Sequence, residues 1–158
     1  MIYKTIDYLK PKAHDAAEKM LAMLDGTGFK YRILETFRST EVQAAYFAQG
    51  RKSLEVVNIM RQQAGLLPIG LADNKNKITN CDGVKILSAH QGGNAIDIVP
   101  IVNGRIPWVD TGISESEASR AWQQLGSIGK SAGFGWGGDW GKTASKLGWD
   151  CPHFEIKG

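Results

Sequence analysis

The chain has 158 residues, of which 42% are hydrophobic and 22% are charged, a composition typical of one globular domain with a core large enough to fold alone. The formal net charge is +3, but the basic residues are dispersed and no nucleic-acid-binding motif is present, so we expect no nucleic-acid partner. No segment approaches the ~20 consecutive apolar residues of a spanning helix, so we expect no membrane insertion.

Hydrophobic patterning in the first half of the chain predicts three helices and one strand. Apolar residues at helical spacing predict a helix over residues 11–24, and a partly alternating pattern predicts a strand over 29–37. Thr40 with Gln43 resembles a capping box that opens a helix ending at Gly50. Ser53 opens a further short helix that ends at Gly65, and residues 66–80 have the composition of a loop.

The second half of the chain predicts three strands and one helix. Strands are expected at residues 84–87, 95–99 and 153–156, and residues 134–148 are expected to form a loop dense in Gly and Trp. Ser114 with Glu117 is a second capping box, and it opens the clearest amphipathic helix, which ends at Gly133. Because helices and strands follow no regular βαβ alternation, the predicted fold class is α+β.

Two of the three histidines lie in segments suited to metal binding. His90 and Asp97 belong to the segment Ser-Ala-His-Gln-Gly-Gly-Asn-Ala-Ile-Asp, in which a Gly-Gly pair supplies the turn that brings them together. His153 belongs to Asp-Cys-Pro-His-Phe-Glu, near the end of the sequence. Two imidazoles and one carboxylate suit a catalytic zinc whose fourth position stays open for water. Asp150, three residues before His153, would lie beside that water as a general base.

Together the two motifs resemble those of the M15 zinc metallopeptidases. This group includes D-Ala-D-Ala carboxypeptidases and dipeptidases of the VanY-like superfamily and phage endolysins that cut L-alanyl-D-glutamate bonds. Phe37-Arg-Ser with Gln43, and the segments 46–51, 78–80 and 136–140, resemble the endolysin-like branch. The resemblance implies a small Hedgehog/DD-peptidase-like fold, a central antiparallel sheet with flanking helices, forming one domain over residues 1–158 without a separate cell-wall-binding domain.

The resemblance also assigns roles to particular residues. It implies that His90, Asp97 and His153 bind Zn²⁺, that Asp150 is the general base, and that Arg38 stabilises the substrate carbonyl as it becomes an oxyanion. Ser88 would support the site through hydrogen bonds.

Several neighbouring residues have simpler interpretations. Glu155 is a rival for the base role, Gln43 is explained as a capping residue, and Asp139 as a residue that orders its loop. His14 is interpreted as a surface or core histidine, and Cys81 and Cys151 as free thiols. Trp136, Trp140 and Trp149 either belong to the core or line a peptide groove.

The resemblance predicts a zinc peptidase that acts on bacterial peptidoglycan stem peptides, and we expect it to be a monomer. The first hypothesis is an L-Ala-D-Glu endopeptidase, and the second is a D,D-carboxypeptidase or dipeptidase. A third is a non-catalytic, zinc-stabilised module that binds the cell wall or a protein, although a structural zinc is usually closed by a fourth protein ligand. Residues 53–77 and 141–149 are longer than expected for the endolysin-like branch, and such loops set substrate preference.

The N-terminal residues lead to an expectation about where the protein acts. They contain no apolar stretch long enough for a secretory signal peptide, so we expect synthesis in the host cytoplasm. Action on the wall would then follow release by a separate route, such as a holin-type lesion.

Overall fold

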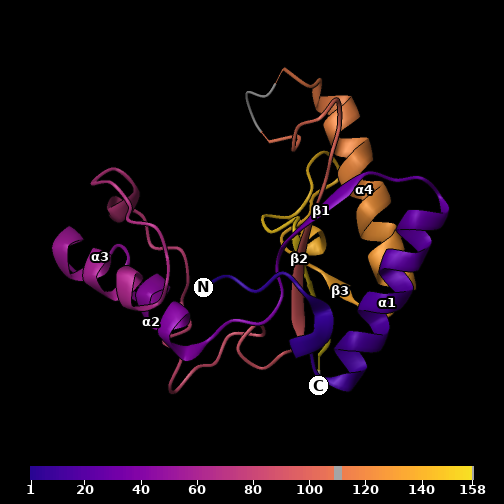
Figure 1. Cartoon of the computed structure of the whole chain (residues 1–158). Helices are drawn as coiled ribbons and strands as arrows, with labels where there is room; N and C mark the ends of the chain where they lie inside the picture. Colours follow the sequence, from indigo (N-terminus) through magenta and orange to yellow (C-terminus); the bar gives the residue numbers. More distant parts are fainter. Residues whose placement is uncertain (109–111, 158) are drawn as a thin grey trace.

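A four-stranded antiparallel sheet forms the centre of the structure, a computed structural model that describes residues 1–108 and 112–157 (Figure 1). The strand order is β1-β2-β4-β3, with β1 at Tyr31–Glu35, β2 at Ala95–Pro100, β3 at Gly135–Trp136 and β4 at His153–Glu155. The helices are α1 (Pro11–Gly26), α2 (Thr40–Ala48), α3 (Leu54–Gln63) and α4 (Glu115–Ser131), and three short 3₁₀ helices are η1 (Ile6–Tyr8), η2 (Asp73–Lys75) and η3 (Gly137–Asp139). The predicted α+β class, with helices flanking an antiparallel sheet, is confirmed.

The sheet has one apolar face and one polar face, and this division creates the site. Helices α1 and α4 pack together over one face, while α2 and α3 lie on the other side of the sheet (Figure 1). Ile96, Ile98 and Phe154 are fully buried in the core beneath α1 and α4. Because neighbouring strand residues point to opposite faces, Asp97 between the two isoleucines points away from this core.

Two glycines let α4 approach the sheet closely. A Cβ at Gly129 would lie 2.2 Å from the ring of Phe154, and one at Gly126 would lie 2.5 Å from the ring of Trp136. The apolar face of this amphipathic helix carries Trp122 and Leu125, which are buried in the same cluster. The two glycines complete that face, since any side chain there would displace an aromatic ring that supports β4.

Three predicted elements differ from the structure. Residues 84–87 form no strand, because the backbone N–H groups of residues 84, 85 and 86 all donate to the Asp82 carboxylate and are unavailable to a ladder. Helix α2 is capped by Ser39, whose Oγ accepts from the amide of Val42 at 3.2 Å, rather than by Thr40, and it ends at Ala48. Within the predicted loop 134–148, β3 pairs with β4.

A second, smaller apolar cluster joins α2 to α3. Its buried members are Val42, Ala45, Ala64 and Leu66, and it is separate from the main core. No helix within residues 1–108 and 112–157 is long and apolar enough to cross a membrane.

Candidate metal centre and active site

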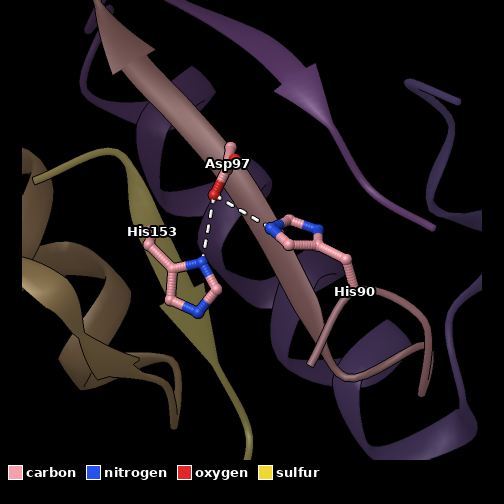
Figure 2. Close-up of side chains that lie close together, drawn as sticks. All are labelled: His90, Asp97 and His153. Atoms are coloured by element: carbon pink, nitrogen blue, oxygen red, sulfur yellow. Dashed lines mark hydrogen bonds and ion pairs between the residues drawn. The ribbon is translucent and has the colours of Figure 1, made fainter. Parts of the chain in front are cut away.

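Strand pairing brings two of the three predicted metal ligands face to face. Asp97 on β2 is the direct register partner of His153 on β4, and His90 reaches them from the turn that precedes β2 (Figure 2). Asp97 Oδ1 lies 3.2 Å from His90 Nε2 and 3.2 Å from His153 Nδ1. The three ligand atoms all lie within 4.8 Å of one another. The Gly-Gly turn is present as predicted, with Gly93 at a φ of 68°.

The outer nitrogen of each imidazole is held by an acceptor. His90 Nδ1 lies 2.6 Å from the carbonyl oxygen of Thr36, and His153 Nε2 lies 3.1 Å from Glu155 Oε2. A carbonyl and a carboxylate accept hydrogen bonds, so these outer nitrogens carry the protons. The inner nitrogens therefore present lone pairs toward Asp97, which is the tautomer that metal ligation requires.

Two nitrogen lone pairs that face a carboxylate repel it unless a positive charge lies between them. Ligand atoms ~2.0–2.1 Å from one tetrahedral zinc lie roughly 3.3 Å apart, close to the two 3.2 Å separations around Asp97 Oδ1. The residues present therefore fit a zinc ion. In the metal-free protein the same arrangement favours the protonated form of His153: burial lowers the pKa of His153, but the hydrogen bond and charge of Asp97 outweigh burial and raise it.

Asp97 remains ionised in this setting. Burial by itself would raise the pKa of its carboxyl, but the neighbouring imidazoles of His153 and His90 hold that pKa well below the usual range. An anionic oxygen and two neutral imidazoles would leave a bound Zn²⁺ with net positive charge, which suits a catalytic rather than a purely structural centre.

The N-terminal segment supports His90 through Thr36. Thr36 is fully buried, its amide donates to the carbonyl of Tyr3 at 2.8 Å, and its hydroxyl donates to the carbonyl of Thr5 at 2.6 Å. The free carbonyl of the same residue then accepts from His90. Residues 3–5 therefore fix the acceptor that sets the tautomer of one candidate ligand, a role that no sequence motif indicated.

Asp150 lies with the triad in a pocket of about 540 Å³. Burial raises the pKa of its carboxyl, the nearby charge of Asp97 raises it further, and His153 acts in the opposite direction. Gly137 fixes the backbone beneath it, since a Cβ at Gly137 would lie 2.1 Å from the Asp150 carbonyl oxygen. A carboxyl with a raised pKa beside a metal site has the properties of a general base.

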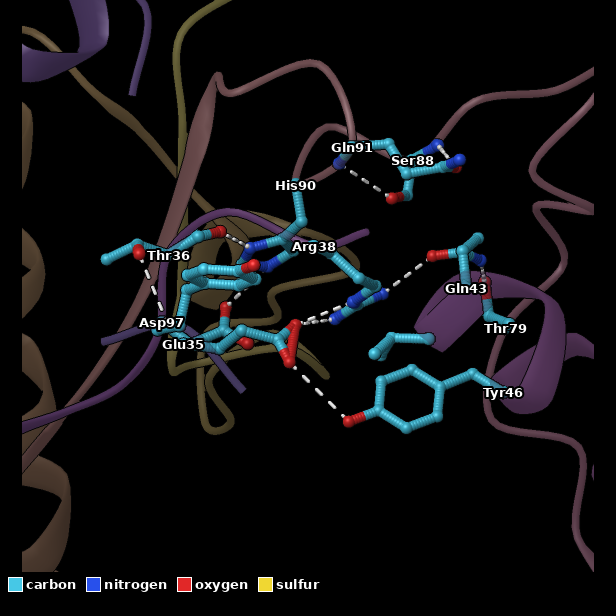
Figure 3. Close-up of polar contacts among 12 residues, drawn as sticks. Glu35, Thr36, Arg38, Gln43, Tyr46, Thr79, Ser88, His90, Gln91 and Asp97 are labelled. Atoms are coloured by element: carbon cyan, nitrogen blue, oxygen red, sulfur yellow. Dashed lines mark hydrogen bonds and ion pairs between the residues drawn. The ribbon is translucent and has the colours of Figure 1, made fainter. Parts of the chain in front are cut away.

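Arg38 lines the same pocket, in a network of side chains (Figure 3). Its Nε donates to Glu35 Oε1 at 2.6 Å, Nη2 also pairs with that oxygen, and Nη1 donates to Gln43 Oε1 at 2.9 Å. The guanidinium lies over the ring of Tyr46, 4.8 Å from its centroid. These contacts use three of the five N–H groups of the guanidinium and leave two for a ligand in the pocket.

Gln43 is a connector rather than a capping residue. It is fully buried, and its amide nitrogen donates to Cys81 O at 2.7 Å and to Thr79 Oγ1 at 3.3 Å. It thus ties Arg38 to the loop that forms the rim of the pocket. The interpretation of Gln43 as a helix cap was wrong, because the cap is Ser39 and the amide is fully engaged elsewhere.

Ser88 lines the pocket, but its described hydrogen bonds are local. Its Oγ accepts from the amide of Gln91, and its own amide donates to Gln91 Oε1, both at 3.1 Å. This reciprocal pair closes the turn that carries His90. Its contribution to the site is therefore to the shape of that turn.

The three tryptophans separate into two groups. Trp136 is buried in the core, and its indole donates to Cys151 O at 2.7 Å. Trp140 and Trp149 line the pocket, with ring centroids 5.2 Å apart, and the Trp140 ring is also 5.2 Å from the ring of His153.

The remaining sequence candidates have structural surroundings. Asp139 pairs with Lys130 at 3.0 Å, and both cysteines are free. His14 lies on α1 beside exposed Asp15 and Glu18. Glu155, the rival base, is occupied by its contact with His153.

A family model described as D-alanyl-D-alanine carboxypeptidase, of peptidase family M15, matches residues 82–156. Residues 82–156, just under half of the chain, therefore match the M15 peptidase family. The matched segment contains His90, Asp97, Asp150 and His153, whereas Arg38 and Gln43 lie outside it. The family resemblance carried by the two motifs is therefore confirmed.

Solved structures share the fold at low sequence identity. The L-Ala D-Glu endopeptidase ChiX of Serratia marcescens is 18% identical, with a TM-score of 0.51 over 96% of this chain and 83% of that chain. The LD-carboxypeptidase LdcB is 18% identical, with a TM-score of 0.54 over 94% of this chain and 58% of that chain. No curated protein sequence matches this chain significantly.

Proposed function

We propose that this protein hydrolyses a peptide bond in peptidoglycan stem peptides with a bound zinc ion, and that the bond is L-Ala-D-Glu. The observation that carries the proposal is the convergence of His90 Nε2, Asp97 Oδ1 and His153 Nδ1 in the same pocket as the Asp150 carboxylate. A structural zinc would need a fourth protein ligand, and among the described residues the metal-ligating group contains three.

The residues of the pocket divide the chemistry between them. When bound, zinc supplies Lewis-acid polarisation of the scissile carbonyl and lowers the pKa of the attacking water. The Asp150 carboxylate takes a proton from that water as the water oxygen bonds to the carbonyl carbon, and it delivers the proton to the amine nitrogen as the C–N bond breaks. The two available N–H groups of Arg38 stabilise the negative charge that develops on the carbonyl oxygen.

An internal bond is favoured by the pairing of Arg38. A carboxypeptidase must bind the terminal carboxylate of its substrate, and a cation already paired with a carboxylate is poorly suited to that task. Arg38 is paired with Glu35, and both side chains are largely buried. The motif similarities outside the triad, from Phe37 to Arg51, favour the same endopeptidase branch.

A D,D-carboxypeptidase is the second candidate function. The description of the matching family model supports it, and so does Lys77, which lines the pocket as a second cation and is exposed. Its ammonium would bind a terminal carboxylate.

Mass spectrometry of a peptidoglycan digest distinguishes the candidates. The zinc-loaded protein is expected to release peptides that begin with D-Glu and to leave L-Ala on the muramic acid. Loss of a single C-terminal D-Ala would instead identify a carboxypeptidase. The Asp150→Asn variant and chelator-treated protein are the controls, and an unchanged digest with the zinc-loaded wild type would leave only the non-catalytic module.

A further inference from the structure

Trp149 is the most exposed aromatic side chain near the candidate active site. Its relative exposure is 77%, although it lines the same pocket as the metal ligands. An exposed indole that lines a pocket is placed to contact a ligand, because it offers a flat apolar face together with a polar N–H.

The backbone holds Trp149 in a fixed position. Its amide donates to the carbonyl of Trp140 at 3.1 Å, and the two rings lie 5.2 Å apart. A Cβ at Gly148 would lie 2.4 Å from the Trp140 carbonyl oxygen, so the two segments touch where only glycine fits. The exposed ring is thus preorganised on its neighbour, which lowers the entropy cost of binding a ligand against it.

The distance from the metal ligands to this ring indicates what would reach it. The ring centroid of Trp140 lies 5.2 Å from that of His153 and 5.2 Å from that of Trp149. The sum of these two distances is the upper limit of the separation between the His153 and Trp149 rings. In the proposed substrate, one alanine and a lactyl ether separate the scissile carbonyl from the sugar ring. Two extended units of roughly 3.3–3.6 Å each bring the sugar to a comparable distance.

We propose that Trp149, supported by Trp140, forms a subsite for the N-acetylmuramic acid sugar next to the scissile bond. A pyranose ring presents C–H groups on its face, which pack on the flat apolar surface of an indole, while the indole N–H stays available to the sugar's polar groups. This inference rests on the proposed endopeptidase function, because only cleavage beside L-Ala places the sugar within reach of Trp149.

The test compares two substrates with the same peptide. One is the disaccharide pentapeptide of peptidoglycan, and the other is the pentapeptide with an acetylated N-terminus in place of the sugars. Wild type is expected to prefer the disaccharide form in kcat/KM, and Trp149→Ala is expected to reduce that preference about tenfold, the size of one lost aromatic contact. Trp149→Phe should retain most of it. A preference that is unchanged in Trp149→Ala would overturn the inference.

Trp108 provides a matched control. It is 45% exposed and its ring lies 5.3 Å from that of Trp122, so it is also a tryptophan stacked on a tryptophan, but it lies outside the pocket. Trp108→Ala is expected to keep the wild-type preference. If it lost the preference equally, the effect would come from stability rather than from the subsite, and the inference would fail.

A binding measurement separates this inference from the proposed function. The indole N–H signal of Trp149, assigned with Trp149→Phe, is followed by NMR while the N-acetylglucosamine–N-acetylmuramic acid disaccharide is added to zinc-loaded protein. A saturating shift of that signal supports the subsite even if no stem peptide is cut, in which case the proposed function alone fails. No shift at millimolar disaccharide overturns the subsite even if hydrolysis is observed.

Discussion

The two walls of the pocket are held in place by different forces. The sheet wall, made of Asp97, His153, Glu155 and Asp150, rests on strand register and on a large apolar core. The helical wall, made of Arg38 and residues 77–81, is held by side-chain hydrogen bonds that involve Glu35 and Gln43, over the small core between α2 and α3. Because the two walls are held independently, we expect the sheet wall to bind the metal and the helical wall to orient the substrate without affecting metal binding.

The largest expected effects on zinc binding and turnover come from two carboxylates of the sheet wall, which we expect to have different roles. Asp97→Ala should lose stoichiometric zinc uptake and all measurable hydrolysis, because it removes a ligand. Asp150→Asn should bind zinc normally but lose turnover by ~10²–10⁴-fold, because an amide cannot accept the proton of the attacking water. Zinc titration and steady-state kinetics on both variants check this. Near wild-type turnover in Asp150→Asn would move the base role to another residue.

On the helical wall, Arg38→Ala should keep zinc and lose turnover by ~10²–10³-fold. Lysine should restore only part of the rate, because it supplies a point charge in place of the planar fork that Glu35 and Gln43 hold. Kinetics at saturating zinc separate kcat from KM. A rise in KM with an unchanged kcat would make Arg38 a ground-state anchor, and weaker zinc binding would contradict the division between the walls.

Glu155→Ala should weaken zinc binding by ~10–100-fold, as expected when a carboxylate that orients a metal-binding histidine is lost. Its contact with His153 Nε2 at 3.1 Å is the physical reason. Turnover at saturating zinc should stay near wild type. Chelator competition measures the affinity. The opposite pattern, with normal affinity and a large loss of turnover, would favour Glu155 over Asp150 as the base.

The packing that supports the sheet wall is tested by two glycines. Gly129→Ala should destabilise the fold by about 1–3 kcal/mol, because its Cβ would overlap the ring of Phe154. Gly26→Ala, at the end of α1 with no atom within 4 Å of the added Cβ, should be neutral or stabilising by up to about 1 kcal/mol. Urea denaturation compares them. Equal effects would mean that α4 does not hold β4 by close contact.

The smallest expected effect is a pH dependence confined to the metal-free protein. The lowered pKa of Asp97 contributes stability that is present above pH ~3.9, its unfolded-state pKa, and is lost as the pH falls below that value. The raised pKa of His153 contributes stability that is present below pH ~6.5, its unfolded-state pKa, and is lost as the pH rises through the raised value. The Tm of metal-free protein should therefore fall from about pH 6 to about pH 8.

Zinc should remove this decline, because the metal replaces the proton between His153 and Asp97 and binds more tightly as the pH rises. Differential scanning calorimetry of both forms measures the effect, and Asp97→Asn is the control in which the metal-free decline should disappear. A metal-free Tm that rises over the same range would show that the ion pair is absent.

The sequence predicted the sheet wall better than the helical wall, for a physical reason. His90, Asp97, Asp150 and His153 lie in two short motifs whose residue types indicate a metal site, so they could be assigned together although strand pairing joins Asp97 to a histidine 56 positions away. The network around Arg38 joins residues 38 positions apart, from Gln43 to Cys81, and no local pattern encodes such a contact.

Local chemistry also explains why some secondary-structure elements were predicted wrongly. Val84, Ile86 and Leu87 alternate as a strand would, but one aspartate captures the amides of residues 84–86 and leaves these side chains exposed. Adjacent Ser39 and Thr40 are both good caps, and the position of the helix is decided by the packing of α2 against α3. β3 has two residues and exists because β4 pairs with it.

X-ray absorption spectroscopy of the zinc-loaded protein tests the central claim most directly. The account predicts one zinc per chain with imidazole nitrogens at ~2.0–2.1 Å, carboxylate oxygen at ~2.0–2.2 Å and no sulfur ligand. The spectrum of His153→Ala, if that variant takes up zinc at all, should lose one imidazole contribution. A sulfur at ~2.3 Å, which would mean that Cys81 or Cys151 closes the site, or a failure of the wild type to take up zinc, would contradict it.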